Sequence, residues 1–305
     1  MTYWLPLPYP PALFSDIPVT IELCPGPDAM PSDPSEVEFF VPPFLAIGSV
    51  VAMIESMPRL KVIQLLSAGA DVWTGRVPDG VRLCDARGVH NASTSEWALT
   101  AILTHLRDFP RYVRAQEHGH WMTRAEIGYA DELTGKRVLI VGAGAIGDLL
   151  ARKLEACEAT VVKVARSARE GVHGVWELPT LLPTADIVVL LVPLTPQTKG
   201  LVDSAFLDRM HDGALLVNAA RGPVVDTEAL LAEVAAGRLH AAIDVTDPEP
   251  LPPGHPLWSL PNVLLTPHVG GAVRGLLGRA YKLVHEQMLR HLAGEPLINE
   301  VVDGY

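Results

Sequence analysis

Three side chains in the C-terminal half of the chain could take part in acid–base or anion chemistry: Arg221, Glu249 and His268. An imidazole exchanges a proton near neutral pH, and a guanidinium can bind a carboxylate or phosphate through two parallel hydrogen bonds. A carboxylate can accept a hydrogen bond from either group. Each of the three residues comes shortly after an apolar run. They could form one site if those runs are strands that end at a common edge.

Six apolar runs in this part of the chain are typical of strands that are buried on both faces. They are Val138–Val141, Thr160–Val164, Ile187–Val192, Ala214–Val217, Ala241–Val245 and Val263–Leu265. Helix-like segments such as Ala145–Cys157 and Thr227–Ala236 separate some of them. This alternation predicts a doubly wound α/β domain with a parallel sheet. Ligands bind at the carboxyl edge of such sheets, and all three polar residues fall there.

A glycine-rich string, Gly142-Ala-Gly-Ala-Ile-Gly147, directly follows the first of these strands and opens a helix. In a dinucleotide-binding turn the first glycine permits the tight turn, the second lets the backbone approach a pyrophosphate, and the third lets the helix pack on the strand. Gly142, Gly144 and Gly147 take these positions. The alternative is a glycine-rich loop without a ligand. Asp148 puts a carboxylate close to the expected phosphates, so we expect its side chain to point away from them.

The end of the second strand indicates which dinucleotide would bind. NAD sites usually place an acidic residue about 20 residues after the first glycine. The segment Val162–Arg169 has no carboxylate and instead carries Arg166, Ser167 and Arg169. A guanidinium would bind a 2′-phosphate that a carboxylate would repel. The sequence therefore favours NADP(H), with NAD(H) still possible. The alternative is that these arginines form a solvated face.

The N-terminal quarter is rich in proline and contains three short apolar runs that are typical of strands. These are Val19–Leu23, Val37–Val41 and Val62–Leu66. They predict a smaller α/β unit. A helix is expected over Ser93–Leu106, with Ser93 as N-cap and Glu96 completing a capping box. A last helix, about Val273–Ala293, could return to the first unit.

These elements divide the chain into two predicted domains. Residues 95–272 would form the Rossmann-type dinucleotide-binding domain. Residues 1–94 and 273–305 would form a discontinuous, flavodoxin-like α/β domain that binds substrate. A length of 305 residues fits two domains of ordinary size.

The bulk composition excludes several classes of partner. The formal net charge of −11 disfavours nucleic acid and anionic membrane surfaces. No apolar run is long enough to cross a membrane, and the N-terminus lacks the features of a signal peptide. Three widely spaced cysteines indicate neither disulfides nor a metal site, so we expect a cytoplasmic protein without a bound metal.

Several strings, in the right order, resemble the D-isomer-specific 2-hydroxyacid dehydrogenases, especially the glyoxylate/hydroxypyruvate reductases. The strings are GAGAIG (142–147), VPLTPQTKGLV (192–202), GALLVNAARGPVVD (213–226), AAIDVTDPEPLP (241–252), HPLW (255–258) and TPHVGG (266–271). An earlier string, IQLLSAGADVW (63–73), resembles the substrate loop of the family. The resemblance is close from about residue 59 to residue 271 and faint before that.

The resemblance implies an oxidoreductase that moves a hydride between NADP(H) and a small 2-keto or 2-hydroxy acid. His268 would be the proton donor in reduction and the acceptor in oxidation. Glu249 would bind the other ring nitrogen and favour the charged imidazolium. Arg221 would hold the substrate carboxylate and polarise the carbonyl beside it. Closure of the two domains would exclude water before hydride transfer.

The resemblance also implies further binding residues. Backbone amides of Ala68, Gly69 and Ala70 would hold the substrate carboxylate together with Arg221. Asp244 would bind the nicotinamide carboxamide. The other candidates for cofactor binding, besides the glycines and the 166–169 loop, are Ala145, Ile146, Pro193, Thr198, Ala219, Ala220 and Gly270.

Each site residue also has an ordinary structural interpretation. His268 could be a turn residue satisfied by the backbone, and Arg221 could be a surface residue near a helix end. Glu249 could be a plain loop acid, and Asp247 competes with it for the same role. Trp97 is expected in a core or an interface.

Two other functions fit the same fold. One is a non-catalytic dinucleotide sensor like the C-terminal binding protein co-repressors, which the absence of extra tails in this sequence disfavours. The other is a relative that acts on formate or phosphite. The substrate itself stays open between glyoxylate, hydroxypyruvate and a bulkier 2-keto acid. A bulkier one would be favoured if apolar residues such as Trp4, Leu5, Phe44 and Leu45 face it.

A homodimer is the expected assembly, since the resemblance implies one built through the cofactor domains. The helix over Ser93–Leu106 and the segment Tyr112–Leu133 are the expected contacts.

Overall fold

The computed structural model describes residues 1–6, 9–43, 47–73 and 75–302. The chain forms two compact units, Met1–His90 with Val273–Tyr305, and Asn91–Ala272. The first unit is thus discontinuous in sequence. The predicted division after residue 94 falls a few residues inside the helix that opens the second unit, and the observed division comes just before that helix.

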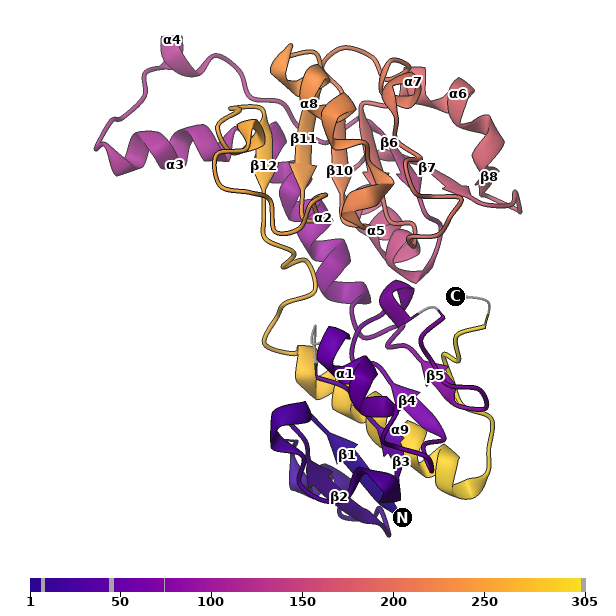
Figure 1. Ribbon diagram of the computed structural model, residues 1–305. Coiled ribbons are helices and arrows are strands. Elements are labelled where there is room, and N and C mark those ends of the chain that lie inside the picture. Colours follow the sequence, from indigo (N-terminus) through magenta and orange to yellow (C-terminus); the bar gives the residue numbers. More distant parts are fainter. Residues whose placement is uncertain (7–8, 44–46, 74, 303–305) are drawn as a thin grey trace. The chain divides into compact units, whose positions relative to one another are not determined.

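The larger unit is built on seven parallel strands: β6 (Arg137–Val141), β7 (Thr160–Ala165), β8 (His173–Gly174), β9 (Ile187–Leu190), β10 (Leu215–Asn218), β11 (His240–Ile243) and β12 (Val263–Leu265). Their order is β12-β11-β10-β9-β6-β7-β8 (Figure 1). The order reverses between β6 and β9. Such a switch point is where ligands bind in doubly wound sheets. The predicted Rossmann-type fold is confirmed, and β8 is a short addition at its edge.

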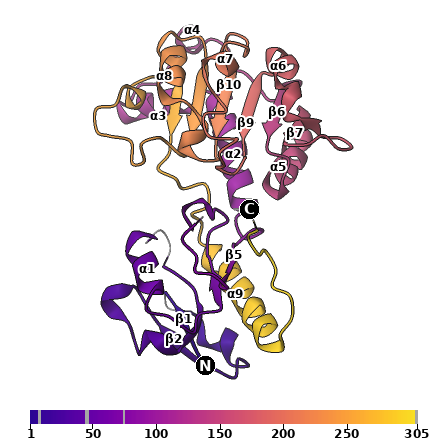
Figure 2. The same ribbon diagram turned by 45° about the vertical axis from the view of Figure 1, so that its right-hand side comes forward.

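Five helices of this unit cover the two faces of the sheet (Figure 2): α2 (Asn91–Leu106), α5 (Ala145–Ala156), α6 (Leu178–Leu181), α7 (Ser204–Leu207) and α8 (Thr227–Ala235). Two more, α3 (Phe109–Glu117) and α4 (Arg124–Ile127), bury no residue in these cores. Val138 and Ile140 of β6 point into the core under α2 and α5. Leu139 and Val141 point into the opposite core, which α6 and α8 cover. Burial on both faces explains the continuous apolar runs and makes the sheet a rigid platform for its edge loops.

The smaller unit contains a five-stranded parallel sheet within its described residues, in the order β2-β1-β3-β4-β5. The strands are β1 (Thr2–Leu5), β2 (Thr20–Leu23), β3 (Val37–Phe40), β4 (Val62–Gln64) and β5 (Arg82–Cys84), and the helices are α1 (Ile47–Ile54) and α9 (Leu276–Ala293). Tyr281, Val284 and Met288 form one apolar stripe of α9 that packs with Tyr3 and Phe39 of the sheet. The last helix therefore completes the first unit, with the strand order of flavodoxin-like folds.

Two strands of this unit have no counterpart in the sequence prediction. β1 and β5 are only four and three residues long, too short for a periodic pattern to stand out. Trp4 and Leu5, considered as pocket residues, are fully buried in the cores of this unit, so the suggestion that they face a substrate is wrong. Phe44 and Leu45 lie outside the described residues.

The helix α2 begins at Asn91, two residues before its predicted N-cap. Ser93 is buried within the first turn, and Glu96 is exposed beside Lys153. The predicted capping box is therefore wrong. The ammonium of Lys153 on α5 donates to the hydroxyl of Ser95, which ties the start of α2 to the neighbouring helix.

None of the helices in the described residues combines the length and the apolar character needed to cross a lipid bilayer.

Two histidine rings are in contact in the larger unit: His105, near the end of α2, and His240, at the start of β11. The rings of His105 and His240 have centroids 4.5 Å apart. Burial, with a smaller contribution from His240, lowers the pKa of His105 to about 4, although Asp108 and Asp131 act in the opposite direction. Burial also lowers the pKa of His240. Both rings are therefore neutral in the folded protein at pH 7.

Acid should weaken the fold through this pair. The pKa of His105 is lower in the folded state than its ordinary value of 6.5, so its contribution to stability is complete above that pH. As the pH falls from about 6.5 towards 4, the unfolded chain binds a proton that the folded chain refuses, at a cost of up to about 1.4 kcal/mol per pH unit. Urea unfolding across this range should show a shallower loss in His105→Leu. A matched change at the exposed His118, His118→Gln, should keep the full loss, and equal slopes in both variants would contradict the assignment.

Candidate active site

The loops that follow β10, β11 and β12 stay side by side beyond the strand ends. The backbone N–H of Asp244 donates to the carbonyl oxygen of Asn218 over 3.0 Å, and that of Thr266 donates to Ile243 over 2.9 Å. The N–H of His268 donates to the carbonyl oxygen of Asp244 over 2.7 Å. In Figure 1 the arrows of β10, β11 and β12 point the same way. The three loops that carry the predicted site residues thus share one edge of the sheet.

His268 and Glu249 form a direct pair. Nδ1 of the ring lies 2.7 Å from Oε1 of the carboxylate, and the two side chains are 38% and 42% exposed. His268 has φ of 54°, a left-handed conformation that is uncommon for residues other than glycine. Because Glu249 engages Nδ1, proton exchange with a ligand would use Nε2. Asp247, the competing acid, is exposed, and its carbonyl oxygen accepts from the hydroxyl of Thr227 over 2.8 Å.

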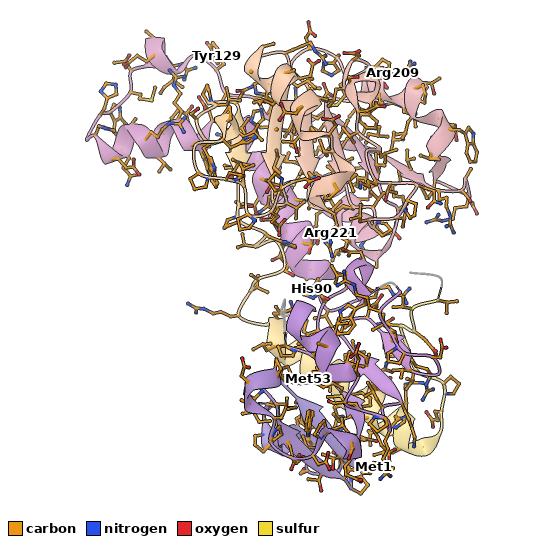
Figure 3. The ribbon with its side chains drawn as sticks, viewed as in Figure 1. Met1, Met53, His90, Tyr129, Arg209 and Arg221 are labelled. Atoms are coloured by element: carbon orange, nitrogen blue, oxygen red, sulfur yellow. The ribbon has the colours of Figure 1, made fainter. Side chains whose placement is uncertain are left out.

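Arg221 lies in the turn directly after β10, half-buried, at the position labelled in Figure 3. Its Nη1 donates to the carbonyl oxygen of Ala220 over 2.8 Å. The buried amide of Asn218 shapes this turn, because its Oδ1 accepts from the N–H of Ala220 and its Nδ2 donates to the carbonyl oxygen of Arg221. A Cβ on Gly222 would lie 1.9 Å from the carbonyl oxygen of Thr246. The arginine turn therefore lies against the loop that leads to Glu249.

The sequence analysis did not single out Asn218. The signal that could have found it is a polar residue at the last position of an otherwise apolar strand, since a buried amide needs hydrogen-bond partners. Asn218 is 2% exposed, and its partners are the backbone of the loop that carries Arg221.

Asp244 is buried, with 4% of its surface exposed, and its carboxylate binds the histidine loop. Oδ1 accepts from the hydroxyl of Thr266 over 2.6 Å and from the N–H of Val269 over 2.8 Å. Oδ2 accepts from the N–H of Gly270 over 2.7 Å. A carboxylate has about four acceptor positions, so Oδ2 retains capacity for one further donor. The predicted contact of Asp244 with a carboxamide is compatible with this geometry and stays a prediction.

The glycine turn after β6 has the shape that a diphosphate requires. A Cβ on Gly142 would lie 2.6 Å from the backbone of Leu191, and one on Gly147 would lie 2.2 Å from the carbonyl oxygen of Gly142. A Cβ on Gly144 would meet nothing within 4 Å. No side chain caps α5, whose first backbone bond runs from Asp148 to Gly144. The N–H groups of Ala145, Ile146 and Gly147 thus lack helical acceptors and fit an anion.

The basic residues at the end of β7 lie close to this turn. Arg166, Ser167 and Arg169 are all exposed. Nη2 of Arg169 donates to the carbonyl oxygen of Ala143, within the glycine turn, over 2.6 Å. The loop therefore offers a guanidinium beside the turn and a second one, Arg166, at the strand end.

Asp148 is paired within the protein. Its Oδ1 lies 2.8 Å from Nζ of Lys163 on β7. The neighbouring ammonium offsets the negative charge that this carboxylate places in the first turn of α5, which accounts for an acid so close to an expected phosphate site.

Ala219 directly follows β10, where its N–H donates to the carbonyl oxygen of Leu190 over 3.3 Å, and the other remaining candidates fall into two groups. Pro193 and Thr198 belong to one turn after β9, where the hydroxyl of Thr198 donates to the carbonyl oxygen of Pro193. Ala68, Gly69 and Ala70 lie after β4 in the smaller unit, and their N–H groups donate to no described residue. Ala70 is buried, and the use of the three amides together with Arg221 stays a prediction.

Comparisons with known proteins agree with this geometry. A family model described as "D-isomer specific 2-hydroxyacid dehydrogenase, NAD binding domain" matches residues 99–270. The chain is 32% identical over 255 residues to the human glyoxylate reductase/hydroxypyruvate reductase, covering 80% of this chain and 77% of that protein. It is 32% identical over 258 residues to D-3-phosphoglycerate dehydrogenase of Archaeoglobus fulgidus, covering 82% of this chain and 48% of that longer protein.

Among solved structures, the NADPH-dependent glyoxylate/hydroxypyruvate reductase of Sinorhizobium meliloti, in complex with NADP and sulfate, matches with a TM-score of 0.84. Its sequence identity is 28%, and the match covers 100% of this chain and 99% of that one. The chain belongs to the D-isomer-specific 2-hydroxyacid dehydrogenase family, whose members are NAD(P)-dependent oxidoreductases.

Proposed function

We propose that this protein is an NADPH-dependent reductase of small 2-keto acids, with glyoxylate and hydroxypyruvate as the first candidate substrates. The observation that carries the proposal is the contact between His268 and Glu249 at the edge of the sheet, beside the turn of Arg221. An acid–base pair and a guanidinium carried on neighbouring loops are what reduction of a carbonyl beside a carboxylate requires. The names of the human and Sinorhizobium relatives support the substrate class.

The side chains divide the reaction between them. A bound NADPH would supply the hydride. Arg221 would hold the substrate carboxylate by charge-assisted hydrogen bonds and polarise the carbonyl next to it. His268 would give a proton from Nε2 to the carbonyl oxygen as negative charge develops there. Glu249, at Nδ1, would orient the ring and leave Nε2 for the transfer.

The residues that would hold the cofactor come from three places. The amides of the glycine turn would bind the diphosphate, and Asp244 would bind the carboxamide through the free capacity of Oδ2. Arg166, Ser167 and Arg169 would bind the 2′-phosphate, for which the end of β7 offers cations and no carboxylate within Val162–Arg169. The Sinorhizobium relative, in complex with NADP, supports this choice.

The proton-transfer role of His268 is tested with a panel of 2-keto acids and NADPH. At least one member should be reduced, and His268→Ala should lower kcat by about 10²- to 10⁴-fold, the usual worth of a positioned acid. The exposed His211 provides a matched control, since His211→Ala removes an imidazole from another surface. Binding of NADPH without turnover of any 2-keto acid would contradict the proposed function.

The preference for NADPH should depend on Arg166. A charge-assisted hydrogen bond is worth about 1.5–3 kcal/mol, so Arg166→Ala should raise KM for NADPH by about 10- to 100-fold and leave KM for NADH nearly unchanged. Arg169→Ala should affect both cofactors, because Arg169 also supports the glycine turn. Arg152→Ala, an exposed arginine of α5, is the matched control. A wild-type preference for NADH would overturn the assignment of the basic loop.

We also propose that the protein forms a homodimer through the segment between α2 and β6. Within its unit, the part that contains α3 and α4 extends away from the sheet (Figure 1, Figure 3). This segment exposes large apolar side chains, with Trp121 93% and Tyr129 90% exposed, as well as Phe109 and Val113. Exposed aromatic side chains in such numbers are typical of an interface.

Sedimentation velocity tests the assembly. The wild-type chain should sediment as a dimer, and Trp121→Glu should shift it towards the monomer, because a buried, unpaired carboxylate is costly at an interface. Trp176→Glu changes an exposed tryptophan outside the segment and should leave the dimer intact. A monomeric wild type, or an equal shift in both variants, would disprove the proposed interface.

A further inference from the structure

A chain of hydrogen bonds links helix α2 to the loop that carries His268. Nε1 of Trp97 lies 3.0 Å from Oγ1 of Thr266, and the same oxygen lies 2.6 Å from Oδ1 of Asp244. An indole N–H can only donate, and an ionised carboxylate can only accept. The hydroxyl of Thr266 must therefore accept from Trp97 and direct its own proton to Asp244. The indole and the carboxylate together therefore fix the direction in which the hydroxyl proton of Thr266 points.

The carboxylate of Asp244, at the end of this series of hydrogen bonds, binds the histidine loop both before and after His268 in the sequence. Asp244 binds Thr266 two residues before His268, and it accepts from the N–H groups of Val269 and Gly270 after it. Its own carbonyl oxygen accepts from the N–H of His268. The left-handed backbone of the histidine, which is uncommon for residues other than glycine, is thus held by four bonds to Asp244 around it and by a longer one from its N–H to the carbonyl oxygen of Thr266, over 3.1 Å.

Trp97 also supports the loop by packing. A Cβ on Gly270 would lie 3.5 Å from Cγ of Trp97, an ordinary packing distance, and only 2.8 Å from Oδ2 of Asp244, so the loop packs against the indole and a glycine lets it approach the carboxylate. Trp97 itself belongs to α2, whose neighbouring residues Ala98, Ala101 and Ile102 are buried in the core under the sheet. The loop is therefore anchored to a rigid helix that is far from it in sequence.

We infer that Trp97 and Thr266 are positioning residues for His268, acting through Asp244. The inference rests on the proposed function, since it assigns no chemistry to either side chain. The hydroxyl of Thr266 sets where Asp244 holds the loop, and the indole of Trp97 sets the direction of that hydroxyl. A displacement of a reacting group by about 1 Å can lower a rate about 100-fold, so a small relaxation of this loop should appear in kcat.

Three substitutions distinguish the effects of the Thr266 hydroxyl, the indole N–H of Trp97 and the size of the side chains. Thr266→Val removes the hydroxyl, Thr266→Ser keeps it, and Trp97→Phe keeps a ring without the N–H. We expect kcat to fall at least about 10-fold in Thr266→Val and less in Trp97→Phe, with the serine variant close to wild type. The dissociation constant of NADPH should change far less than kcat, and Thr266→Val should lower the melting temperature by only a few degrees, because Asp244 keeps its two amide donors. Trp258→Phe loses an indole bond of the same 3.0 Å length, to Pro252, and should keep full kcat.

A double-mutant cycle with His268→Gln distinguishes positioning from a merely structural effect. If Thr266 acts by placing the imidazole, Thr266→Val should cost little further activity once the imidazole is gone. An equal loss in both backgrounds would overturn the inference, as would a loss that follows the melting temperature or NADPH binding. A wild-type protein without 2-keto acid turnover would instead defeat the proposed function, whereas an active wild type with an unaffected Thr266→Val defeats only this inference.

Discussion

The buried carboxylate of Asp244 is the interaction on which the arrangement of the site depends. A charge at 4% exposure is costly unless hydrogen bonds replace its hydration, and here one hydroxyl and two backbone amides do so. All three donors belong to the loop after β12. Satisfying the carboxylate and shaping the loop of His268 are therefore the same requirement, and the loop cannot relax without leaving a buried charge short of donors.

The parallel sheet makes this arrangement possible. Because β10, β11 and β12 are neighbours in register, residues just past their ends come together although they are far apart in the chain. The hydrogen-bond ladder continues for a residue or two beyond the last strand pair and passes from Asn218 to Asp244 to His268. Each loop thus begins from a fixed point, and the residues proposed to act in catalysis lie farther along it: Arg221 after β10, Glu249 after β11 and His268 after β12.

Much of this could be predicted from the sequence, for physical reasons that differ from one feature to the next. The glycine turn was predictable because the backbone itself requires Gly142 and Gly147, where a Cβ would meet other backbone atoms. The residues that support the histidine loop, Trp97 and Thr266, could not be predicted from the sequence. Trp97 and Thr266 are 169 residues apart, and nothing local in either segment indicates a partner. The strands β1 and β5 were missed for a related reason, since their pairing comes from the sheet and not from a pattern within three or four residues.

The acidic balance of the chain adds a last constraint. With a net charge of −11, the protein as a whole repels an anionic cofactor and an anionic substrate alike. Attraction must come from short-range groups, because salt screens charges beyond about 10 Å. Lys163 offsets Asp148 beside the glycine turn, and Arg169 lies against the carbonyl of Ala143. Recognition then rests on donors placed within contact distance, which select for a phosphate or a carboxylate of the right geometry and not for negative charge in general. The same reasoning applies to the proposed substrate: Arg221 and His268 would bind the carboxylate and carbonyl that all 2-keto acids share, so they define a reaction class before they define a substrate.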